Sequence, residues 1–219
     1  MVKNQIAARG VRSGAVLGAL RRVPREAFLP EPLWGLAYED SPLPIAAEQT
    51  ISQPYIVALM TEALNLTGGE KVLEIGTGSG YAAAVLSEIA AEVYTIERIG
   101  QLADKAALTL AKLGYRNVHV VHADGTLGWA AEAPYDAIVV AAGGPDVPES
   151  LKQQLKVGDR LVIPIGTDPC VQELVCITRT SYDAFKRENL AEVRFVPLIG
   201  KEGWAPETSP LKIDQKEAF

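Results

Sequence analysis

Residues 71–81 read KVLEIGTGSGY, an apolar run that passes directly into three glycines at every second position, Gly76, Gly78 and Gly80. The apolar run predicts a buried strand, and the stretch that begins near Gly80 predicts a helix. Glycines between a strand and a helix let the backbone turn tightly and let a ligand approach without a Cβ in the way. The segment therefore predicts a cofactor site at a strand-to-helix turn of an α/β fold.

Glu97 ends the next predicted strand, 21 positions after Gly76. An acid at that place accepts hydrogen bonds from both ribose hydroxyls of a nucleoside, so loop and acid together predict an adenosine-containing cofactor. The dinucleotide fingerprint G-x-G-x-x-G requires a third glycine where this chain has Tyr81. A loop preceded by Glu74 that reads G-x-G-x-G is typical of S-adenosylmethionine, which we favour over a nicotinamide cofactor.

Apolar runs and helical stretches alternate from this segment onward, which predicts a parallel sheet with helices on both faces. Helices are expected from near Gly80, over residues 102–113, and over residues 146–158, where Asp146 and Glu149 have the spacing of a capping box. The last two strands lack a connection long enough for a helix, so that edge is expected to be antiparallel. Strands are expected over residues 71–76, 92–97, 118–122, 135–141, 160–166, 171–177 and 193–199.

Residues 1–65 precede the alternating pattern and are expected to form a helical and loop extension of a single domain. The sheet core is expected over residues 66–205 and a loose tail over residues 206–219. Residues 1–28 carry six basic side chains and one acid, with apolar residues at helical spacing. We interpret them as a solvated helix packed on the domain, the alternative being contact with an acidic partner or a membrane.

Residues 29–51 are rich in proline and polar turn residues and predict an ordered loop. A loop of this length inside a compact domain is usually functional. Ser52 follows it directly, and Pro54 favours a helix start. Ser52 is therefore the expected N-cap of the next helix.

The composition excludes several classes of protein. The chain has 219 residues, of which 48% are hydrophobic and 22% charged, an ordinary globular balance. The formal net charge of −6 offers no basic field to a nucleic-acid backbone, so no nucleic-acid partner is expected. No apolar run approaches the roughly 18 residues of a membrane span, and no signal-peptide core is present. We therefore expect a cytoplasmic protein with no membrane partner.

The cysteines and histidines do not predict a metal site. Cys170 and Cys176 flank a predicted strand that would hold their Cα atoms about 20 Å apart, beyond the roughly 7 Å limit of a disulfide. Their spacing also matches no zinc site. His119 and His122 are three positions apart on one predicted strand and face opposite ways. We expect packing or surface roles for all four residues.

Two further segments follow predicted strands at the edge where ligands bind in open α/β sheets. Asp124 and Gly125 come after the third strand, and Ala141 begins a run of small residues after the fourth. Asp124 can accept a hydrogen bond from an adenine amino group or serve only as a turn residue, and the sequence leaves both open. The small side chains from Ala141 onward leave room for a substrate.

Several segments along the chain carry a family resemblance: VPREAFLP (23–30), AYEDSPLPI (37–45), QTISQP (49–54), VLEIGTGSGY (72–81), YTIER (94–98), YDAIVVAAGGPDVPESL (135–151), RLVIPIG (160–166) and VRFVPLIGKEGW (193–204). Through them the chain resembles the protein-L-isoaspartate (D-aspartate) O-methyltransferase family over about residues 9–204. The glycine loop alone marks only a methyltransferase. The segments AYEDSPLPI with QTIS, and RFVPLIGKEGW, are far more specific and lie where substrate choice would be set.

This resemblance implies a doubly wound, mostly parallel seven-stranded Rossmann-like methyltransferase sheet. It also implies transfer of a methyl group from S-adenosylmethionine to the free α-carboxylate of L-isoaspartyl residues in damaged proteins and peptides, and it leaves open whether D-aspartyl residues are accepted. The ester then closes to a succinimide unaided, which starts repair. A carboxylate is already ionised at pH 7, because its pKa is about 4, so no general base is required. The protein is expected to act as a monomer.

The resemblance also assigns roles to individual residues. Ser52 is the active-site hydroxyl that hydrogen-bonds the substrate carboxylate, and Val196 beside Pro197 lines the substrate cleft. Residues 49–51 close over the cofactor. The full set expected to bind the cofactor is Gln49, Thr50, Ile51, Ser52, Glu74, Gly76, Thr77, Gly78, Gly80, Glu97, Asp124, Gly125 and Ala141.

One segment departs from the family pattern, which has Gly-x-Gly where this chain has Ala46, Ala47 and Glu48. Glycines at 46 and 48 indicate backbone angles that other residues adopt only with strain, and Glu48 would add a carboxylate near the substrate. We therefore expect a slower enzyme. Two alternatives stay open, a methyltransferase for another carboxylate and a non-catalytic adenosyl-binding module.

Overall fold

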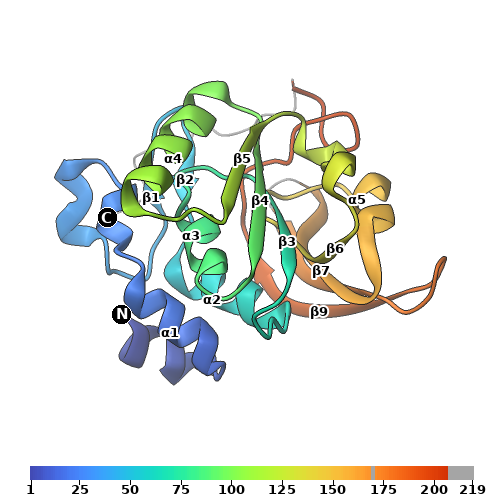
Figure 1. Ribbon diagram of the computed structural model, residues 1–219, viewed down its shortest axis with the longest axis horizontal. Helices are drawn as coiled ribbons and strands as arrows, with labels where there is room; N and C mark the ends of the chain where they lie inside the picture. Colours follow the sequence, from blue (N-terminus) through green and yellow to red (C-terminus); the bar gives the residue numbers. More distant parts are fainter. Residues whose placement is uncertain (169–170, 207–219) are drawn as a thin grey trace.

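The computed structural model describes residues 1–168 and 171–206, which form a seven-stranded sheet with helices on both sides (Figure 1). The strand order is β5-β4-β3-β6-β7-β8-β9. The first five strands in that order run parallel, and β8 and β9 are antiparallel to their neighbours. The predicted doubly wound, mostly parallel sheet is confirmed. Its strands are β3 (Lys71–Ile75), β4 (Glu92–Glu97), β5 (Val118–His122), β6 (Tyr135–Val140), β7 (Leu155–Asp168), β8 (Val171–Arg179) and β9 (Phe185–Val193).

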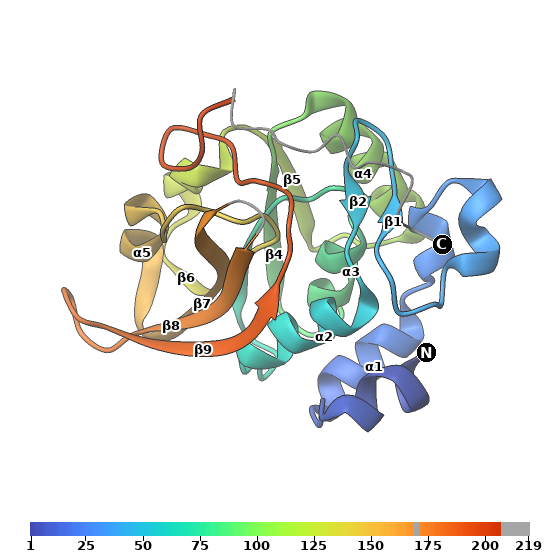
Figure 2. The same ribbon diagram turned by 180° about the vertical axis from the view of Figure 1, so that it is seen from behind.

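Both faces of the sheet are buried because neighbouring residues of each central strand point to opposite sides. Val72 of β3 belongs to an apolar cluster with Met60 and Leu86, whereas Leu73 belongs to a cluster with Leu151. Figures 1 and 2 accordingly show α5 on one side of the sheet and α2 and α3 on the other. The helices are α1 (Gly14–Arg22), α2 (Pro54–Ala63), α3 (Tyr81–Ser87), α4 (Gly100–Leu113) and α5 (Glu149–Gln154).

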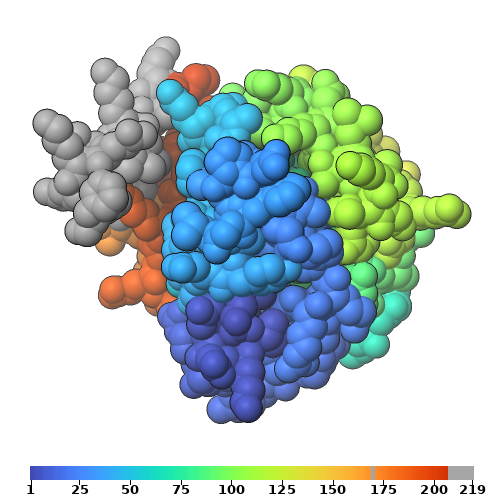
Figure 3. Space-filling view, turned by 90° about the vertical axis from the view of Figure 1, so that its left-hand side faces the viewer, coloured from blue at the N-terminus to red at the C-terminus, as the bar shows by residue number. Residues whose placement is uncertain are grey.

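The N-terminal extension packs on the domain, as its apolar spacing predicts. Val16 and Leu20 of α1 are buried, and they share an apolar cluster with Tyr81 of α3. Figure 3 shows the extension in blue across this side of the molecule, beside α4 in green. Its shorter elements are η1 (Val2–Ile6), η2 (Ala7–Arg9), η3 (Arg25–Phe28), η4 (Glu31–Leu36), β1 (Leu43–Pro44) and β2 (Thr50–Ile51), and two more, η5 (Gly125–Leu127) and η6 (Ala130–Glu132), follow β5.

The cap expected for α2 is wrong. The helix begins at Pro54, and the Ser52 side chain does not cap it. Asp40 takes that role from the preceding loop, because its Oδ1 accepts a hydrogen bond from the backbone N–H of Tyr55 at 2.8 Å. The Ser52 hydroxyl has no hydrogen-bond partner within the described residues and is left available for a ligand.

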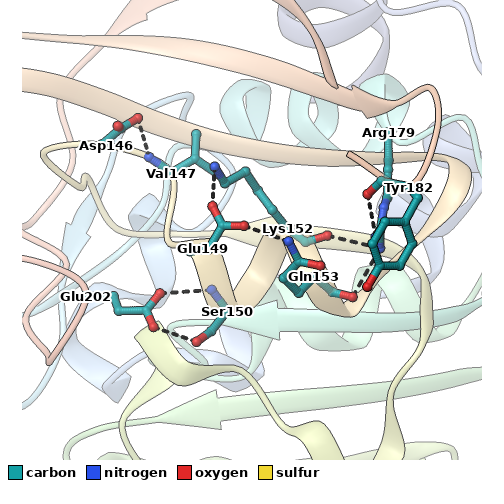
Figure 4. A network of polar contacts seen from close by, with 9 residues as sticks. All are labelled: Asp146, Val147, Glu149, Ser150, Lys152, Gln153, Arg179, Tyr182 and Glu202. Carbon is teal, nitrogen blue, oxygen red and sulfur yellow. Dashed lines mark hydrogen bonds and ion pairs between the residues drawn. The ribbon is translucent and has the colours of Figure 1, made fainter. Parts of the chain in front are cut away.

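The expected start and end of α5 are also wrong. The helix ends at Gln154, before the predicted Gly158, because β7 begins at the next residue. The Asp146 carboxylate accepts only from the adjacent Val147 N–H within the described part of the chain. Instead Glu202 accepts from Ser150, at 2.9 Å from its backbone N–H and 2.6 Å from its hydroxyl (Figure 4).

The last strand lies earlier than predicted. Residues 185–193 form β9, whereas residues 194–199 leave the sheet and cross the carboxyl ends of its strands. β9 is an edge strand with mostly exposed side chains, so its sequence looks polar. The following segment looks like a strand because Phe195 and Leu198 are buried, but the Gln172 side chain, and not a neighbouring strand, bonds the Phe195 backbone.

Candidate functional site: two adjoining cavities

A cavity opens at the carboxyl ends of β3, β4 and β6, where the chain changes its direction of crossing the sheet. Such a switch point is the usual ligand position in open α/β sheets. Three segments far apart in the sequence form its walls, residues 49–52, the glycine loop, and residues 196–199. Ten of the thirteen predicted cofactor residues line the cavity, on these segments or beside them: Gln49, Thr50, Ile51, Ser52, Gly76, Thr77, Gly78, Glu97, Gly125 and Ala141.

The glycine loop needs its glycines because three of them have positive φ. The φ angles are 92° at Gly76, 54° at Gly78 and 90° at Gly80. A residue with a Cβ is strained in this region, so the loop presents bare backbone to the cavity. Gly80 is the N-cap residue of α3 and lies outside the cavity wall.

Glu97 lies on the cavity wall with only 7% of its surface exposed. Its Oε2 accepts from the backbone N–H of Gly78, and its Oε1 accepts from that of Ile99, both at 2.9 Å. An ionised carboxylate accepts about four hydrogen bonds, so each oxygen keeps capacity for a ligand hydroxyl. The carboxylate therefore holds the loop in shape and still faces the cavity.

Glu74 lies beneath the glycine loop, fully buried and outside the cavity wall. Its Oε2 accepts from the Thr95 hydroxyl at 2.5 Å, and that hydroxyl is 2.7 Å from the hydroxyl of Thr77 on the cavity wall. Burial raises the pKa of Glu74 to about 8, although the Thr95 hydrogen bond opposes the rise and the charge of Glu97 adds to it. Glu74 thus reaches the cavity only through two hydroxyls.

Asp124 acts as the turn residue that the sequence leaves open as one alternative. Its Oδ1 accepts from the backbone N–H and the hydroxyl of Thr126, and its Oδ2 accepts from the Lys201 N–H at 2.8 Å. Burial raises the pKa of Asp124, but these hydrogen bonds outweigh it and leave the pKa below its ordinary value. Asp124 thereby fastens the segment after Ile199 to the sheet edge, while its neighbour Gly125 lines the cavity.

The hairpin of β1 and β2 carries residues 49–52 over the cavity. Its turn runs over residues 46–49, with the Gln49 N–H donating to the Ala46 carbonyl at 3.3 Å. Ala47 and Glu48 have φ angles of 57° and 56°, the combination of a type I′ turn, which favours Asn-Gly. The backbone strain expected at Glu48 is confirmed, whereas the strain expected at Ala46 is wrong. The second strained residue is Ala47. The Glu48 side chain is exposed and lines neither cavity, so its expected repulsion of the substrate gains no support.

We expect Glu48→Gly to stabilise the protein by about 1 kcal/mol, because it relieves a left-handed conformation that costs a non-glycine residue about 1–2 kcal/mol. Thermal unfolding should shift upward by about 2–4 °C, as is typical for a chain of this length. Ala46→Gly is the matched control, since Ala46 has no positive φ and the change should be neutral or destabilising. Equal shifts in the two variants would contradict this account.

A second cleft adjoins the first cavity on the side of β9. It is lined by Pro42, Gln53, Ile56 and residues 192–196. Thr50, Ser52, Ala141 and Val196 belong to the walls of both cavities. A ligand in the cavity and a second one in the cleft would therefore meet at these four residues, which include the predicted Ser52 and Val196.

Sequence reasoning missed several residues of the site. Arg98 and Ile99 follow the acid of β4 and line the first cavity, and so do Leu198 and Ile199 beside Pro197. A signal was present for Arg98, Leu198 and Ile199, since they belong to the matching segments YTIER and VRFVPLIGKEGW. Arg25, which contacts the Ser52 backbone, carried no local signal of a site.

The predicted absence of a metal site is not contradicted, since no group of three metal-ligating side chains occurs within residues 1–168 and 171–206. His119 lies beside Glu92 and stacks on Tyr94, a surface role as expected. Cys176 is buried, and Cys170 lies outside the described residues. Among the described helices, none is long and apolar enough to cross a membrane.

Comparisons with known proteins agree with this geometry. A family model described as protein-L-isoaspartate(D-aspartate) O-methyltransferase matches residues 1–203. A protein-L-isoaspartate O-methyltransferase from Rhodopseudomonas palustris is 69% identical over 93% of this chain and 94% of its own length. A second, from Marinobacter nauticus, is 59% identical over 93% of both.

Two solved structures have the same fold. One protein-L-isoaspartate O-methyltransferase superposes with a TM-score of 0.81 at 33% identity, covering 90% of this chain, which spans 64% of that longer chain. Another, from Plasmodium falciparum and in complex with S-adenosyl-L-homocysteine, has a TM-score of 0.76 at 25% identity, covering 88% of this chain and 94% of its own.

Proposed function

The chain belongs to the protein-L-isoaspartate(D-aspartate) O-methyltransferase family, and on this premise we propose that it methylates the free α-carboxylate of L-isoaspartyl residues in damaged proteins and peptides, with S-adenosylmethionine as the methyl donor. The observation that carries the proposal is the wall shared by the two cavities. Thr50, Ser52, Ala141 and Val196 stand where a donor in one cavity meets an acceptor in the other.

The residues of the first cavity fit an adenosyl cofactor. Bare backbone at Gly76 and Gly78 allows close approach, and the Glu97 carboxylate retains acceptor capacity for ribose hydroxyls. The hairpin residues Gln49 and Ile51 cover the opposite side. This donor and acceptor set agrees with the S-adenosyl-L-homocysteine in the Plasmodium falciparum structure.

Catalysis then requires positioning and little acid–base chemistry. Bound S-adenosylmethionine supplies an electrophilic methyl group on a sulfonium. The substrate carboxylate is ionised at neutral pH, because its pKa is about 4, and it serves as the nucleophile itself. The Ser52 hydroxyl donates a hydrogen bond to it, and Val196 and Ala141 confine it beside the donor. Holding both groups in line is catalysis by proximity and orientation. The methylated substrate dissociates, and the backbone nitrogen of its next residue attacks the ester carbonyl and expels methanol, which closes a succinimide and starts repair.

The test is methylation of an isoaspartyl peptide and of its twin with a normal aspartyl residue, each with labelled S-adenosylmethionine. We expect label in the isoaspartyl peptide alone, because only that linkage exposes an α-carboxylate within the chain. Equal labelling of both peptides would indicate a methyltransferase for another carboxylate. Binding of the cofactor without labelling of either peptide would indicate an adenosyl-binding module.

Ser52→Ala is expected to lower kcat/KM for the isoaspartyl peptide by about 10- to 100-fold, the effect of one hydrogen bond to a charged group. Because the hydroxyl caps no helix, the melting temperature should stay close to that of the unchanged protein. Cofactor affinity, measured by calorimetry, should change little. Ser52→Thr is the control, since it keeps a hydroxyl and should retain more activity. An unchanged kcat/KM in Ser52→Ala would overturn the assignment.

We also propose that residues 1–65 and 66–205 form one domain that acts as a monomer in the cytoplasm. The tail predicted over residues 206–219 lies, except for residue 206, outside the described residues. One support is the continuous core, since α3 contributes Tyr81 to the cluster under the extension and Leu86 to the cluster under the sheet. A second is that one chain supplies every wall of both cavities. The buried thiol of Cys176 fits a reducing compartment.

A further inference from the structure

Arg25 lies in η3 with none of its surface exposed, beneath the point where the two cavities meet. Its Nη1 donates to the Ala37 carbonyl at 2.6 Å, and its Nη2 donates to the carbonyls of Ser41 at 3.2 Å and Ser52 at 3.0 Å. The guanidinium carbon lies 5.6 Å from the ring centre of Tyr81, which lines the first cavity. One side chain thus joins the extension, the loop before the hairpin and the residue at the cavity boundary.

This arrangement is poorly suited to stability alone. Within the described residues Arg25 forms no ion pair, and its buried Nε has no hydrogen-bond partner. Asp40, the acid next to Ser41 in the same loop, forms an ion pair with Arg9 at 2.6 Å instead. Burial lowers the pKa of Arg25, although nearby tyrosines and Asp40 oppose this shift. A buried cation without a carboxylate partner is unfavourable, so a contribution beyond stability accounts better for it.

The planar shape of the Arg25 guanidinium group determines which hydrogen bonds form at this site. Three carbonyl oxygens converge on two terminal nitrogens of one rigid guanidinium, two of them from the loop before the hairpin and one from the residue after β2. A lysine ammonium has a similar charge but is a point donor on a flexible stem, and it cannot hold the same three oxygens in fixed directions. The Ser52 side chain itself has no hydrogen bond within the described residues. The hydrogen bond from Arg25 to the Ser52 backbone carbonyl therefore fixes the position of this residue.

We propose that Arg25 is a positioning residue for methyl transfer, holding Ser52 at the boundary of the two cavities so that its hydroxyl meets the substrate carboxylate. The inference rests on the proposed function, because it requires Ser52 to contact the substrate. It differs from a general structural role in one respect: the effect of Arg25 on turnover passes through the hydroxyl of Ser52.

The test is a double-mutant cycle of Arg25→Lys and Ser52→Ala, read as kcat/KM for an isoaspartyl peptide. Arg25→Lys alone should lower kcat/KM by about tenfold, with calorimetric affinity for S-adenosylhomocysteine nearly unchanged. In the Ser52→Ala protein the same change should lower kcat/KM by less than about threefold, because the hydroxyl that Arg25 positions is already gone. Arg9→Lys is the control, an exposed arginine of the same extension that contacts Asp40 and should leave kcat/KM unchanged.

An equal loss in both backgrounds, or no loss from Arg25→Lys, would overturn the inference while the unchanged protein still methylates the peptide. Failure of the unchanged protein to methylate it would instead overturn the proposed function. If Arg25→Lys does not fold, the side-chain Nε–H resonance of Arg25 in the unchanged protein decides. It should shift when the isoaspartyl peptide binds and stay in place with the aspartyl twin. An unmoved resonance with bound isoaspartyl peptide would reject the inference.

Discussion

Replacing Glu97 with alanine is expected to weaken the binding of S-adenosylhomocysteine by about 100-fold. The change removes two charge-assisted hydrogen bonds to the ribose, each worth about 1.5–3 kcal/mol before water restores a part. It also releases the backbone N–H of Gly78, which the carboxylate holds at 2.9 Å. Both losses should act in the same direction, because the glycine loop and Glu97, which line the proposed cofactor cavity, are joined by this hydrogen bond.

Calorimetric titration of the variant with S-adenosylhomocysteine measures this loss. The dissociation constant of Glu97→Gln should fall between those of the unchanged protein and Glu97→Ala. The glutamine amide keeps one acceptor oxygen but places a donor against the other N–H. Glu92→Ala is the matched control at the other end of β4, where the side chain is exposed and contacts His119. A dissociation constant of Glu97→Ala within about threefold of the unchanged protein would refute the assignment.

Glu74→Gln is expected to remove a pH dependence of stability worth roughly 3 kcal/mol between pH 5 and pH 8. Burial raises the pKa of Glu74 to about 8, whereas in the unfolded chain the pKa lies near 4.5. Over this window the folded state keeps a proton that the unfolded state has released. The unfolding free energy of the unchanged protein therefore falls as the pH rises toward 8. Glutamine has no proton to lose and keeps an oxygen for the Thr95 hydroxyl.

Urea unfolding of both proteins at pH 5 and pH 8 measures this difference. The advantage of Glu74→Gln should be small at pH 5 and large at pH 8. Glu70→Gln is a control of opposite sign, because hydrogen bonds from Thr67 and Gly68 outweigh burial and lower the pKa of Glu70. The Glu70 carboxylate stabilises the fold above the pKa that it has in the unfolded chain, and this contribution is lost only as the pH falls below that pKa. The effect of Glu70→Gln on the unfolding free energy should therefore be nearly equal at pH 5 and pH 8. A constant difference between Glu74→Gln and the unchanged protein would contradict the buried-proton account.

The elements that the sequence predicted well are those whose signal is local. The helix that ends at Gly114 appears as α4, because its apolar spacing and its glycine cap both act within one helix. The loop from Gly76 to Gly80 could also be predicted from local sequence, since a glycine adopts positive φ without a side chain to oppose it. Glu97 was found because its spacing from the loop is fixed by one strand–helix–strand unit.

The predictions that were wrong concern elements whose partners are distant in the sequence. Asp40 caps α2 from 15 residues away and Glu202 caps α5 from 52 residues away, so neither cap could be found from residues beside the helix. The last strand was misplaced for a related reason. Phe195 lies in the crossing segment itself, where it is buried and its backbone is paired with the Gln172 side chain, so that segment looks like a buried strand. The true edge strand, β9, looks polar because most of its side chains are exposed.

The α/β class, the family, and a glycine loop followed by an acid at the end of the next strand can all be predicted from the sequence, because each depends on short spacings or on short segments in a fixed order. Which of the predicted residues line a cavity depends on the tertiary structure. It placed Glu74 under the loop and bound both oxygens of Asp124, and it brought Ser52 and Val196 to one boundary although 144 positions separate them. Side-chain direction and hydrogen-bond partners are set by packing between distant segments, which no local pattern encodes.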